Sequence, residues 1–265
     1  MRILIGLAVL LFAACGGPRL SEKEFPSRSG DLDGIRYNYR IYLPADRNPA
    51  EKIPVMLYLH GSNRRGKDNR SQLEDLADVI KEYPPPFIMV FPQCPEGTFW
   101  AGPAMQRALA ALDQTVKEFN GDENRLYLAG FSMGGFGAWQ AAVTYPNKFA
   151  AVVPVAGGIL PLGQPSEEDK AQLSPAVRAA IEQPDIYRAY AAAIGTTPVW
   201  VFHGEKDEAV PVEGARKMVE TLKAAGNPNV KYTEFENVGH GSVIKAFTEP
   251  GLYAWLAEQR KNIPR

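Results

Sequence analysis

The sequence predicts an α/β fold built on a mostly parallel, doubly wound sheet with helices on both faces. Five short runs are almost continuously apolar, as expected of parallel strands that are covered on both sides: residues 55–59, 87–91, 126–129, 151–155 and 199–202. Segments with apolar residues at helical spacing lie between these runs. Strand–helix alternation over 265 residues is typical of one large α/β domain.

Further elements extend this pattern at both ends of the chain. Residues 36–43 alternate as in a half-exposed antiparallel edge strand, and residues 231–235 alternate as in a strand near the far edge. Helices are predicted at residues 73–82, 103–119, 135–145, 212–225 and 249–260. The stretch 161–195 is longer than a simple connection needs, which indicates a small cap segment.

The first fifteen residues have the pattern of an export signal and are left out of the fold. Arg2 precedes an apolar run at residues 3–12, and Ala13-Ala14 stands before Cys15. This arrangement resembles a bacterial lipobox, which implies lipidation of Cys15 and anchoring in the cell envelope, on its periplasmic or extracellular face. An ordinary signal peptide with an incidental cysteine is the alternative. Residues 16–30 are predicted to be a tether, and residues 31–265 the folded domain.

Composition excludes several other classes of function. With a net charge of −1 and a pI near 6.3, the protein has no positive electrostatic potential that would attract nucleic acid. The lipid anchor is the only contact with a membrane that we expect. Three histidines and two cysteines, without CxxC or HExxH spacing, predict no metal site. No cofactor is expected. If Cys15 carries lipid, Cys94 has no intramolecular disulfide partner.

One short motif indicates nucleophilic chemistry. Residues 130–134 read Gly-Phe-Ser-Met-Gly, which matches G-x-S-x-G, directly after a predicted strand and before a predicted helix. That setting is the one a nucleophile elbow requires, with Ser132 raised above the sheet. A glycine-rich packing turn is the alternative. The motif in this context predicts the α/β-hydrolase fold.

A serine nucleophile needs a base and an acid, which follow it in that fold in the order acid, then histidine. His240, in a glycine-flanked loop after the 231–235 strand, is the predicted base. Asp207 is the predicted acid because the Val210-Pro211 that follows it resembles the acid loop of this fold, although Glu205 and Glu208 compete and a solvated charge cluster is the alternative. His203 ends a buried strand and is expected to form a local hydrogen bond.

Acyl transfer also requires donors for the oxyanion. The amide of Met133 follows the nucleophile and is one predicted donor. The second is expected from the loop after the 55–59 strand, where Gly61 lets the backbone come close and Ser62 offers its N–H. His60 is expected to brace this loop.

These motifs together resemble secreted bacterial α/β-hydrolases known as predicted peptidases or prolyl-oligopeptidase-like esterases, close to feruloyl and acetyl-xylan esterases. The resemblance extends from about residue 53 to the C-terminus and rests on 60–62 with 65–69, 92–95, 130–135, 202–204 with Asp207, and 239–240. It implies serine-dependent hydrolysis of feruloyl, acetyl or other short-chain esters of carbohydrates. Dienelactone hydrolases have a cysteine nucleophile, whereas this chain has Ser132.

Two alternatives to an esterase remain open at this stage: a serine peptidase of the same fold, and a glycan-binding lipoprotein without catalysis. The sequence gives only weak indications of the substrate, which is expected to be a small-molecule ester or a polysaccharide ester. Phe99 and Trp100 could form the wall of an aryl or sugar site, or could simply pack in the core. A run of Arg64, Arg65 and Lys67 could attract an acidic substrate, or could be a solvated face.

Overall fold

The computed structural model describes residues 24–159 and 166–261. Within them, eight strands form one sheet in the order β1-β2-β4-β3-β5-β6-β7-β8. Their bounds are β1 Ser27–Leu32, β2 Ile35–Tyr42, β3 Ile53–Leu59, β4 Ile88–Pro92, β5 Gly121–Phe131, β6 Ala151–Val155, β7 Val199–Gly204 and β8 Val230–Phe235. Strands β3 to β8 pair in parallel, whereas β2 pairs antiparallel with both β1 and β4. The predicted mostly parallel sheet is confirmed.

The sheet begins earlier than the sequence predicts. Strand β1 starts at Ser27, inside the predicted tether of residues 16–30, and pairs with β2 in the register Ser27↔Arg40. Residues 36–43 are therefore not an edge strand, since β1 covers them. Phe25 before β1 is buried against Phe91. The polar sequence of β1, SRSGDL, carries no apolar alternation by which it could be recognised.

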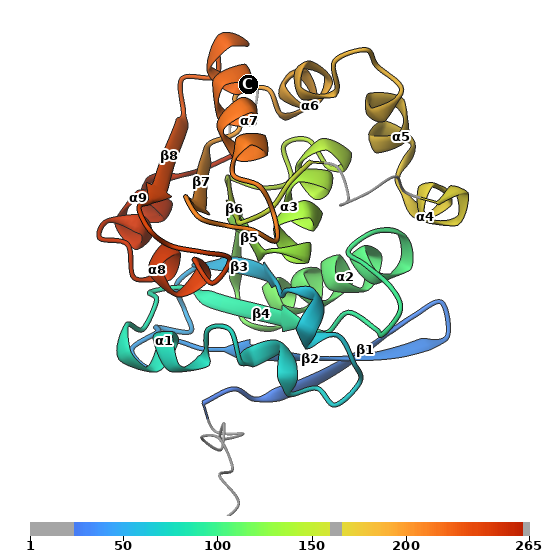
Figure 1. Cartoon of the computed structure of the whole chain (residues 1–265). Coiled ribbons are helices and arrows are strands. Elements are labelled where there is room, and N and C mark those ends of the chain that lie inside the picture. Colours follow the sequence, from blue (N-terminus) through green and yellow to red (C-terminus); the bar gives the residue numbers. More distant parts are fainter. Residues whose placement is uncertain (1–23, 160–165, 262–265) are drawn as a thin grey trace, which may run out of the picture.

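Helices cover both faces of the sheet, as predicted (Figure 1). Alternation along β3 sends Leu57 and Leu59 into one core and Met56 and Tyr58 into the other. The first core is covered by α2 Gly102–Glu118, α3 Met133–Thr144, α5 Pro175–Ile181, α6 Ile186–Ile194 and α7 Glu213–Ala224. The second is covered by α1 Ala77–Glu82, α8 Val243–Phe247 and α9 Leu252–Glu258.

Two predicted helices are shorter in the structure. The segment 73–82 is split into a 3₁₀ turn, η2 Ser71–Leu73, and the short helix α1. The segment 249–260 keeps only α9, because Pro250 has no N–H to donate and Gly251 adopts a φ of +90°. Helix α8 before it, at Val243–Phe247, is not predicted by the periodicity.

The described part of the predicted cap segment, residues 166–195, contains three short helices, α4 Glu167–Gln172, α5 and α6. Ser166, Ser174 and Asp185 begin them, and each side chain accepts backbone N–H bonds in the first turn. Helices α5 and α6 pack on α3, and α6 also packs on α7. The cap thus lies beside the helix that follows Ser132 (Figure 1).

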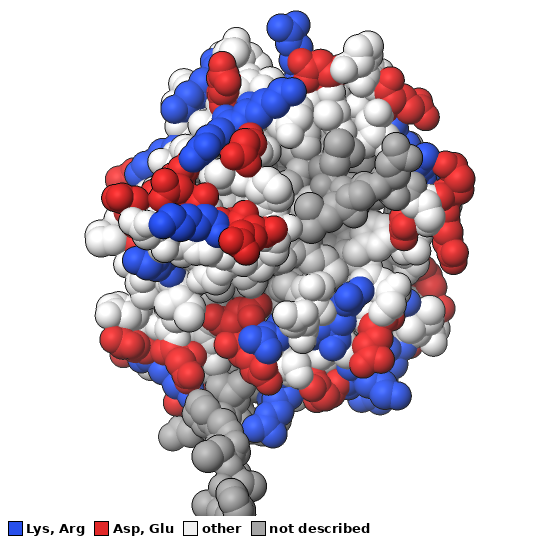
Figure 2. Space-filling view, in the orientation of Figure 1, with Lys and Arg blue, Asp and Glu red and all other residues white. Residues whose placement is uncertain are grey.

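The surface mixes charges of both signs. On the face shown in Figure 2, Lys and Arg side chains are interspersed with Asp and Glu side chains. No helix within residues 24–159 and 166–261 is long and apolar enough to cross a membrane. The described residues also contain no group of three His, Cys, Asp or Glu that could hold a metal ion. Cys15 and its predicted export signal lie outside the described residues.

Candidate active site

The nucleophile lies at the junction of β5 and α3. Strand β5 ends at Phe131 and helix α3 begins at Met133, so Ser132 occupies the turn, with φ +53° and ψ −118°. A non-glycine residue pays for this backbone conformation with strain. A side chain at Gly130 would overlap the carbonyl oxygen of Gly134, and one at Gly134 would overlap that of Leu59. The two motif glycines are therefore needed for the turn to close.

Three predicted site residues meet in one hydrogen-bonded chain. His240 Nε2 lies 2.8 Å from Ser132 Oγ, and His240 Nδ1 lies 2.8 Å from Asp207 Oδ2. A neutral imidazole that donates from Nδ1 to the carboxylate leaves Nε2 free to accept the serine proton. The competing Glu205 instead accepts the N–H of Asn237, at 2.9 Å. The structure thus brings Asp207, not Glu205, to the histidine.

The Asp207 carboxylate is held on all sides. Its side chain is fully buried, and Oδ1 accepts the N–H groups of Ala209 and Val210 at 3.0 and 2.8 Å. The sequence predicts a local hydrogen bond for His203, and its Nε2 lies 2.8 Å from the carbonyl oxygen of Val210. The same atom lies 3.3 Å from Asp207 Oδ2, a contact that sequence reasoning missed. Burial lowers the pKa of His203, so its imidazole is neutral and donates from Nε2.

His203 therefore positions the acid, and its replacement tests that role. We expect His203→Leu to lower kcat roughly tenfold with little change in KM, because the loop that holds Asp207 loses the hydrogen bond to Val210 and Asp207 loses its 3.3 Å contact, without any loss of substrate contact. His203→Gln, which keeps an amide donor near the position of Nε2, is expected to restore most of the activity. Steady-state kinetics on p-nitrophenyl acetate measure both. Equal loss in the two variants would mean that His203 acts only through packing.

The two predicted oxyanion donors line the same cavity as Ser132. The N–H groups of Ser62 and Met133 have no hydrogen-bond acceptor among the described residues. A Cβ on Gly61 would lie 3.3 Å from the Phe131 ring and 3.5 Å from Ser132 Cβ, so this loop runs directly beside the nucleophile. Both amides are thus available to a ligand at Ser132, and their role as oxyanion donors stays a prediction.

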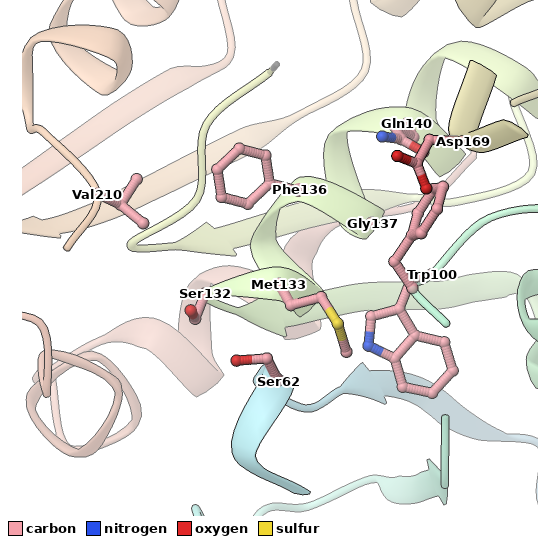
Figure 3. Close-up of a pocket in the computed structure, with 10 residues that line it drawn as sticks. Ser62, Trp100, Ser132, Met133, Phe136, Gly137, Gln140, Asp169 and Val210 are labelled. Carbon is pink, nitrogen blue, oxygen red and sulfur yellow. The ribbon is translucent and has the colours of Figure 1, made fainter. Parts of the chain in front are cut away.

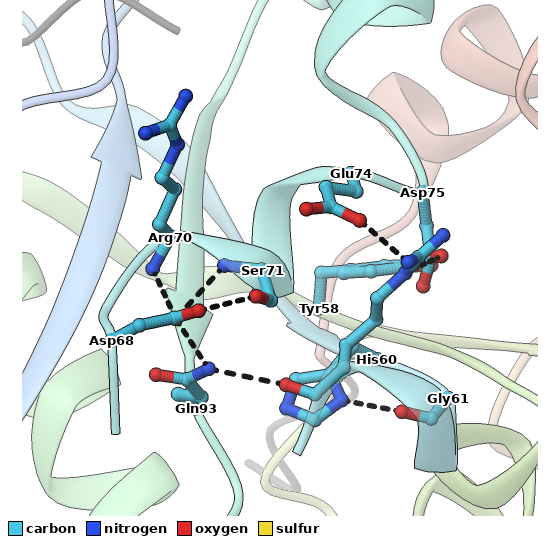
Figure 4. A network of polar contacts seen from close by, with 10 residues as sticks. Tyr58, His60, Gly61, Asp68, Arg70, Ser71, Glu74, Asp75 and Gln93 are labelled. Carbon is cyan, nitrogen blue, oxygen red and sulfur yellow. Dashed lines mark hydrogen bonds and ion pairs between the residues drawn. The ribbon is translucent and has the colours of Figure 1, made fainter. Parts of the chain in front are cut away.

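His60 braces the loop that carries Ser62 (Figure 4). Its Nδ1 donates to the carbonyl oxygen of Gly61 at 2.7 Å, and its Nε2 accepts the N–H of Cys94 at 3.0 Å. The Trp100 indole donates to the carbonyl oxygen of His60 at 2.9 Å. Burial lowers the pKa of His60 to about 4 and raises that of the Cys94 thiol to about 11. Cys94 is a packed, buried thiol.

The neighbouring cations have internal partners. Arg64 forms ion pairs with Glu74 and, at 2.9 Å, with Asp75. Arg65 donates to the carbonyl oxygens of Ser62 and Thr98. The two arginines therefore hold the oxyanion loop in place, which favours a structural role over attraction of an acidic substrate.

The low pKa of His60 predicts a loss of stability in acid. The unfolded chain binds this proton near pH 6.5 and the folded chain only near pH 4, so the free energy of unfolding falls as pH drops between these values. At about 1.4 kcal/mol per pH unit, His60 alone contributes a loss of roughly 3 kcal/mol. Urea unfolding at pH 7 and pH 4.5 measures the change. His60→Gln should flatten the dependence; an unchanged slope would exclude His60 as its source.

A cavity of about 280 Å³ opens beside Ser132 (Figure 3). Phe99 and Trp100 line it, together with Met133 and Phe136, so most of its wall is apolar. Trp100 is nevertheless only 1% exposed. It therefore packs in the core and also forms part of the cavity wall, the two roles that the sequence left open. Two polar lining residues, Gln140 and Asp169, are not predicted from the sequence. They belong to no motif: Gln140 lies on α3, about two turns after Ser132, and Asp169 comes from α4 of the cap.

Comparison with known proteins gives this site its context. A model of the prolyl oligopeptidase family matches residues 100–261, which include Ser132, Asp207 and His240. A solved structure titled as a thermostable esterase is similar over 90% of this chain and 64% of its own, with a TM-score of 0.71 and 29% identity. The fold is therefore the α/β-hydrolase fold.

Two relatives in sequence are named as esterases, and a third as a secreted protein. Acetylxylan esterase A of Emericella nidulans is 29% identical over 76% of this chain and 73% of its own length. Feruloyl esterase B of Thermothelomyces thermophilus is 26% identical over 95% of this chain and 93% of its own length. An uncharacterized secreted protein of Arthroderma benhamiae is 27% identical over 84% of this chain, which spans only 25% of that relative's length.

Proposed function

Because the chain belongs to the prolyl oligopeptidase family and joins Ser132, His240 and Asp207 by hydrogen bonds, we propose that it is a serine carboxylic-ester hydrolase. The substrates proposed are feruloyl, acetyl or other short-chain esters of carbohydrates. The observation that carries the proposal is the pair of 2.8 Å hydrogen bonds through His240. The names of the relatives, an acetylxylan esterase and a feruloyl esterase, support the substrate class.

The geometry suits acyl transfer in two steps. Ser132 Oγ attacks the ester carbonyl while His240 Nε2 takes its proton, and Asp207 stabilises the imidazolium that forms. The N–H groups of Ser62 and Met133 hold the oxyanion. His240 then protonates the leaving alcohol, and the same histidine activates the water that releases the acid from Ser132.

A serine peptidase is the second candidate, favoured by the family description. Ester hydrolysis is the better supported of the two, because alcohols leave with less protonation than amines and a triad beside an open cavity is sufficient. A glycan-binding protein without catalysis is the least supported reading, since all three triad members are present and joined.

Export and lipid anchoring at Cys15 are part of the proposal. The signal-like N-terminus and the name of the secreted relative support export. Growth of the producing cells with labelled palmitate tests the anchor: Cys15→Ser should abolish incorporation of the label. Label retained in Cys15→Ser would contradict lipidation at this residue.

The activity itself is tested on a small panel of substrates. p-Nitrophenyl acetate, methyl ferulate, acetylated xylan and a chromogenic peptide would each be incubated with the purified protein and with a Ser132→Ala control. Turnover of the esters that requires Ser132 supports the proposed function. Turnover of the peptide alone would replace it with the peptidase, and no turnover of any substrate would contradict both.

A further inference from the structure

The side chain of Gln140 has no hydrogen-bond partner among the residues that the structure describes. The residue is only 6% exposed. It lines both the cavity beside Ser132 and a second cavity, of about 450 Å³, between α2, α3 and the cap. Buried polar groups are nearly always hydrogen-bonded, to protein or to water, so an amide that faces the cavity without a protein partner is available to a polar group of a ligand.

The cavity beside Ser132 follows one face of α3. Met133, Phe136, Gly137 and Gln140 have the spacing i, i+3, i+4 and i+7, and all of them line it. Gln140 lies eight positions after Ser132, which corresponds to roughly 12 Å along the helix axis. An acetyl methyl group lies only about 1.5 Å from its carbonyl carbon. An acetyl group would therefore leave most of the cavity empty and would not reach Gln140.

This cavity lies on the acyl side of the ester. Ser62 and Met133, the predicted oxyanion donors, line it, whereas His240 does not. The leaving alcohol must face His240, because His240 protonates it. The acyl chain consequently extends in the other direction, between Phe99 and Phe136 toward Gln140. Aromatic walls on this path favour a flat, unsaturated or aryl chain.

Asp169 supplies an acceptor at the same end of the cavity. In Figure 3 both Asp169 and Gln140 lie at the end away from Ser132. Asp169 Oδ2 accepts two hydrogen bonds from Ser166, from N at 3.1 Å and Oγ at 2.7 Å, which fixes the carboxylate. Its Oδ1 has no hydrogen bond with a described residue. A ligand hydroxyl could donate to Asp169 and accept from Gln140, whereas a ligand carboxylate would be repelled.

We propose that this cavity is a specificity site for acyl groups that combine an aromatic ring with a hydroxyl group at the end remote from the ester. The inference rests on the proposed esterase function and narrows it, because it places hydroxyaryl esters above acetyl esters. Gln140 and Asp169 bind the distal hydroxyl group, and Phe99, Phe136 and Met133 contact the ring.

The test compares methyl 4-hydroxycinnamate with methyl cinnamate, which differ only in that hydroxyl group. In the wild-type protein we expect kcat/KM to be at least about tenfold higher for the hydroxylated ester, as a hydrogen bond to a charged group would give. Electron donation by the hydroxyl makes the ester less reactive, so intrinsic reactivity does not produce this preference. Gln140→Met and Asp169→Asn should each bring the ratio close to one.

Controls separate the inference from the proposed function. Gln183→Met changes an exposed glutamine whose side chain donates to the carbonyl oxygen of Ala179, and it should keep the wild-type ratio. Equal rates on the two cinnamates in the wild-type protein, or a ratio that survives in both Gln140→Met and Asp169→Asn, would overturn the specificity site. If the specificity site were overturned in this way but Ser132-dependent hydrolysis of p-nitrophenyl acetate were observed, the proposed esterase function would still hold. If Gln140→Met did not fold, the ratio of kcat/KM in the wild-type protein and in Asp169→Asn would decide whether the specificity site exists.

Discussion

Ser132→Ala is expected to lower kcat for p-nitrophenyl acetate by roughly four to six orders of magnitude. Ser132 Oγ forms the hydrogen bond to His240 Nε2, at 2.8 Å, so its removal takes away both the nucleophile and the proton that the histidine accepts. The residual rate would come from the oxyanion amides and from binding, which leave a small acceleration over water. Stopped and steady-state assays with the purified variant measure the loss.

The loss should occur without unfolding. Alanine at position 132 has the same backbone strain as serine at φ +53°, and the hydrogen bond from the N–H of residue 132 to the carbonyl oxygen of Val155 is kept. The midpoint of thermal unfolding should therefore stay close to that of the wild type. Ser242→Ala is a matched control, because its buried hydroxyl has no partner among the described residues. A Ser132→Ala protein that keeps a tenth of the activity would have another nucleophile.

The parts of this site that sequence reasoning located are those with local signals. The nucleophile turn is encoded within five residues, since only glycine fits at positions 130 and 134. Asp207 and His240 follow strands β7 and β8, and the parallel sheet brings the carboxyl ends of those strands to one edge. Chain order and the end of each strand are therefore sufficient to place the triad.

The parts that were missed depend on contacts between distant segments. Strand β1 has a polar sequence and is held by its pairing with β2, so its own residues do not reveal it. The contact of His203 with Asp207 requires the loop between them to turn back on itself, which the hydrogen bonds from Ala209 and Val210 bring about. Gln140 lies on α3, whose many apolar residues predict only that the helix packs in the core. Only the cavity shows that its amide faces an open space, without a partner among the described residues.

Asp207→Asn is expected to lower kcat by roughly three to four orders of magnitude, because an amide cannot satisfy both of its neighbours. If its oxygen accepts the N–H groups of Ala209 and Val210, its NH₂ group faces His240 Nδ1 and forces the proton onto Nε2. The histidine then presents a proton to Ser132 instead of accepting one. If the amide is turned the other way, its NH₂ group opposes two backbone donors, which costs about 1–3 kcal/mol of stability.

Kinetics and unfolding distinguish these two orientations of the amide. The first orientation lowers kcat and the rate of Ser132 labelling by a fluorophosphonate while the free energy of unfolding stays near that of the wild type. The second lowers the free energy of unfolding as well. Glu205→Gln is the matched control, since Glu205 bonds the N–H of Asn237 and not the histidine, and its rate should stay within about threefold of the wild type. A larger loss in Glu205→Gln than in Asp207→Asn would make Glu205 the acid, because the residue that orients His240 is the one whose neutral analogue stops the proton transfer.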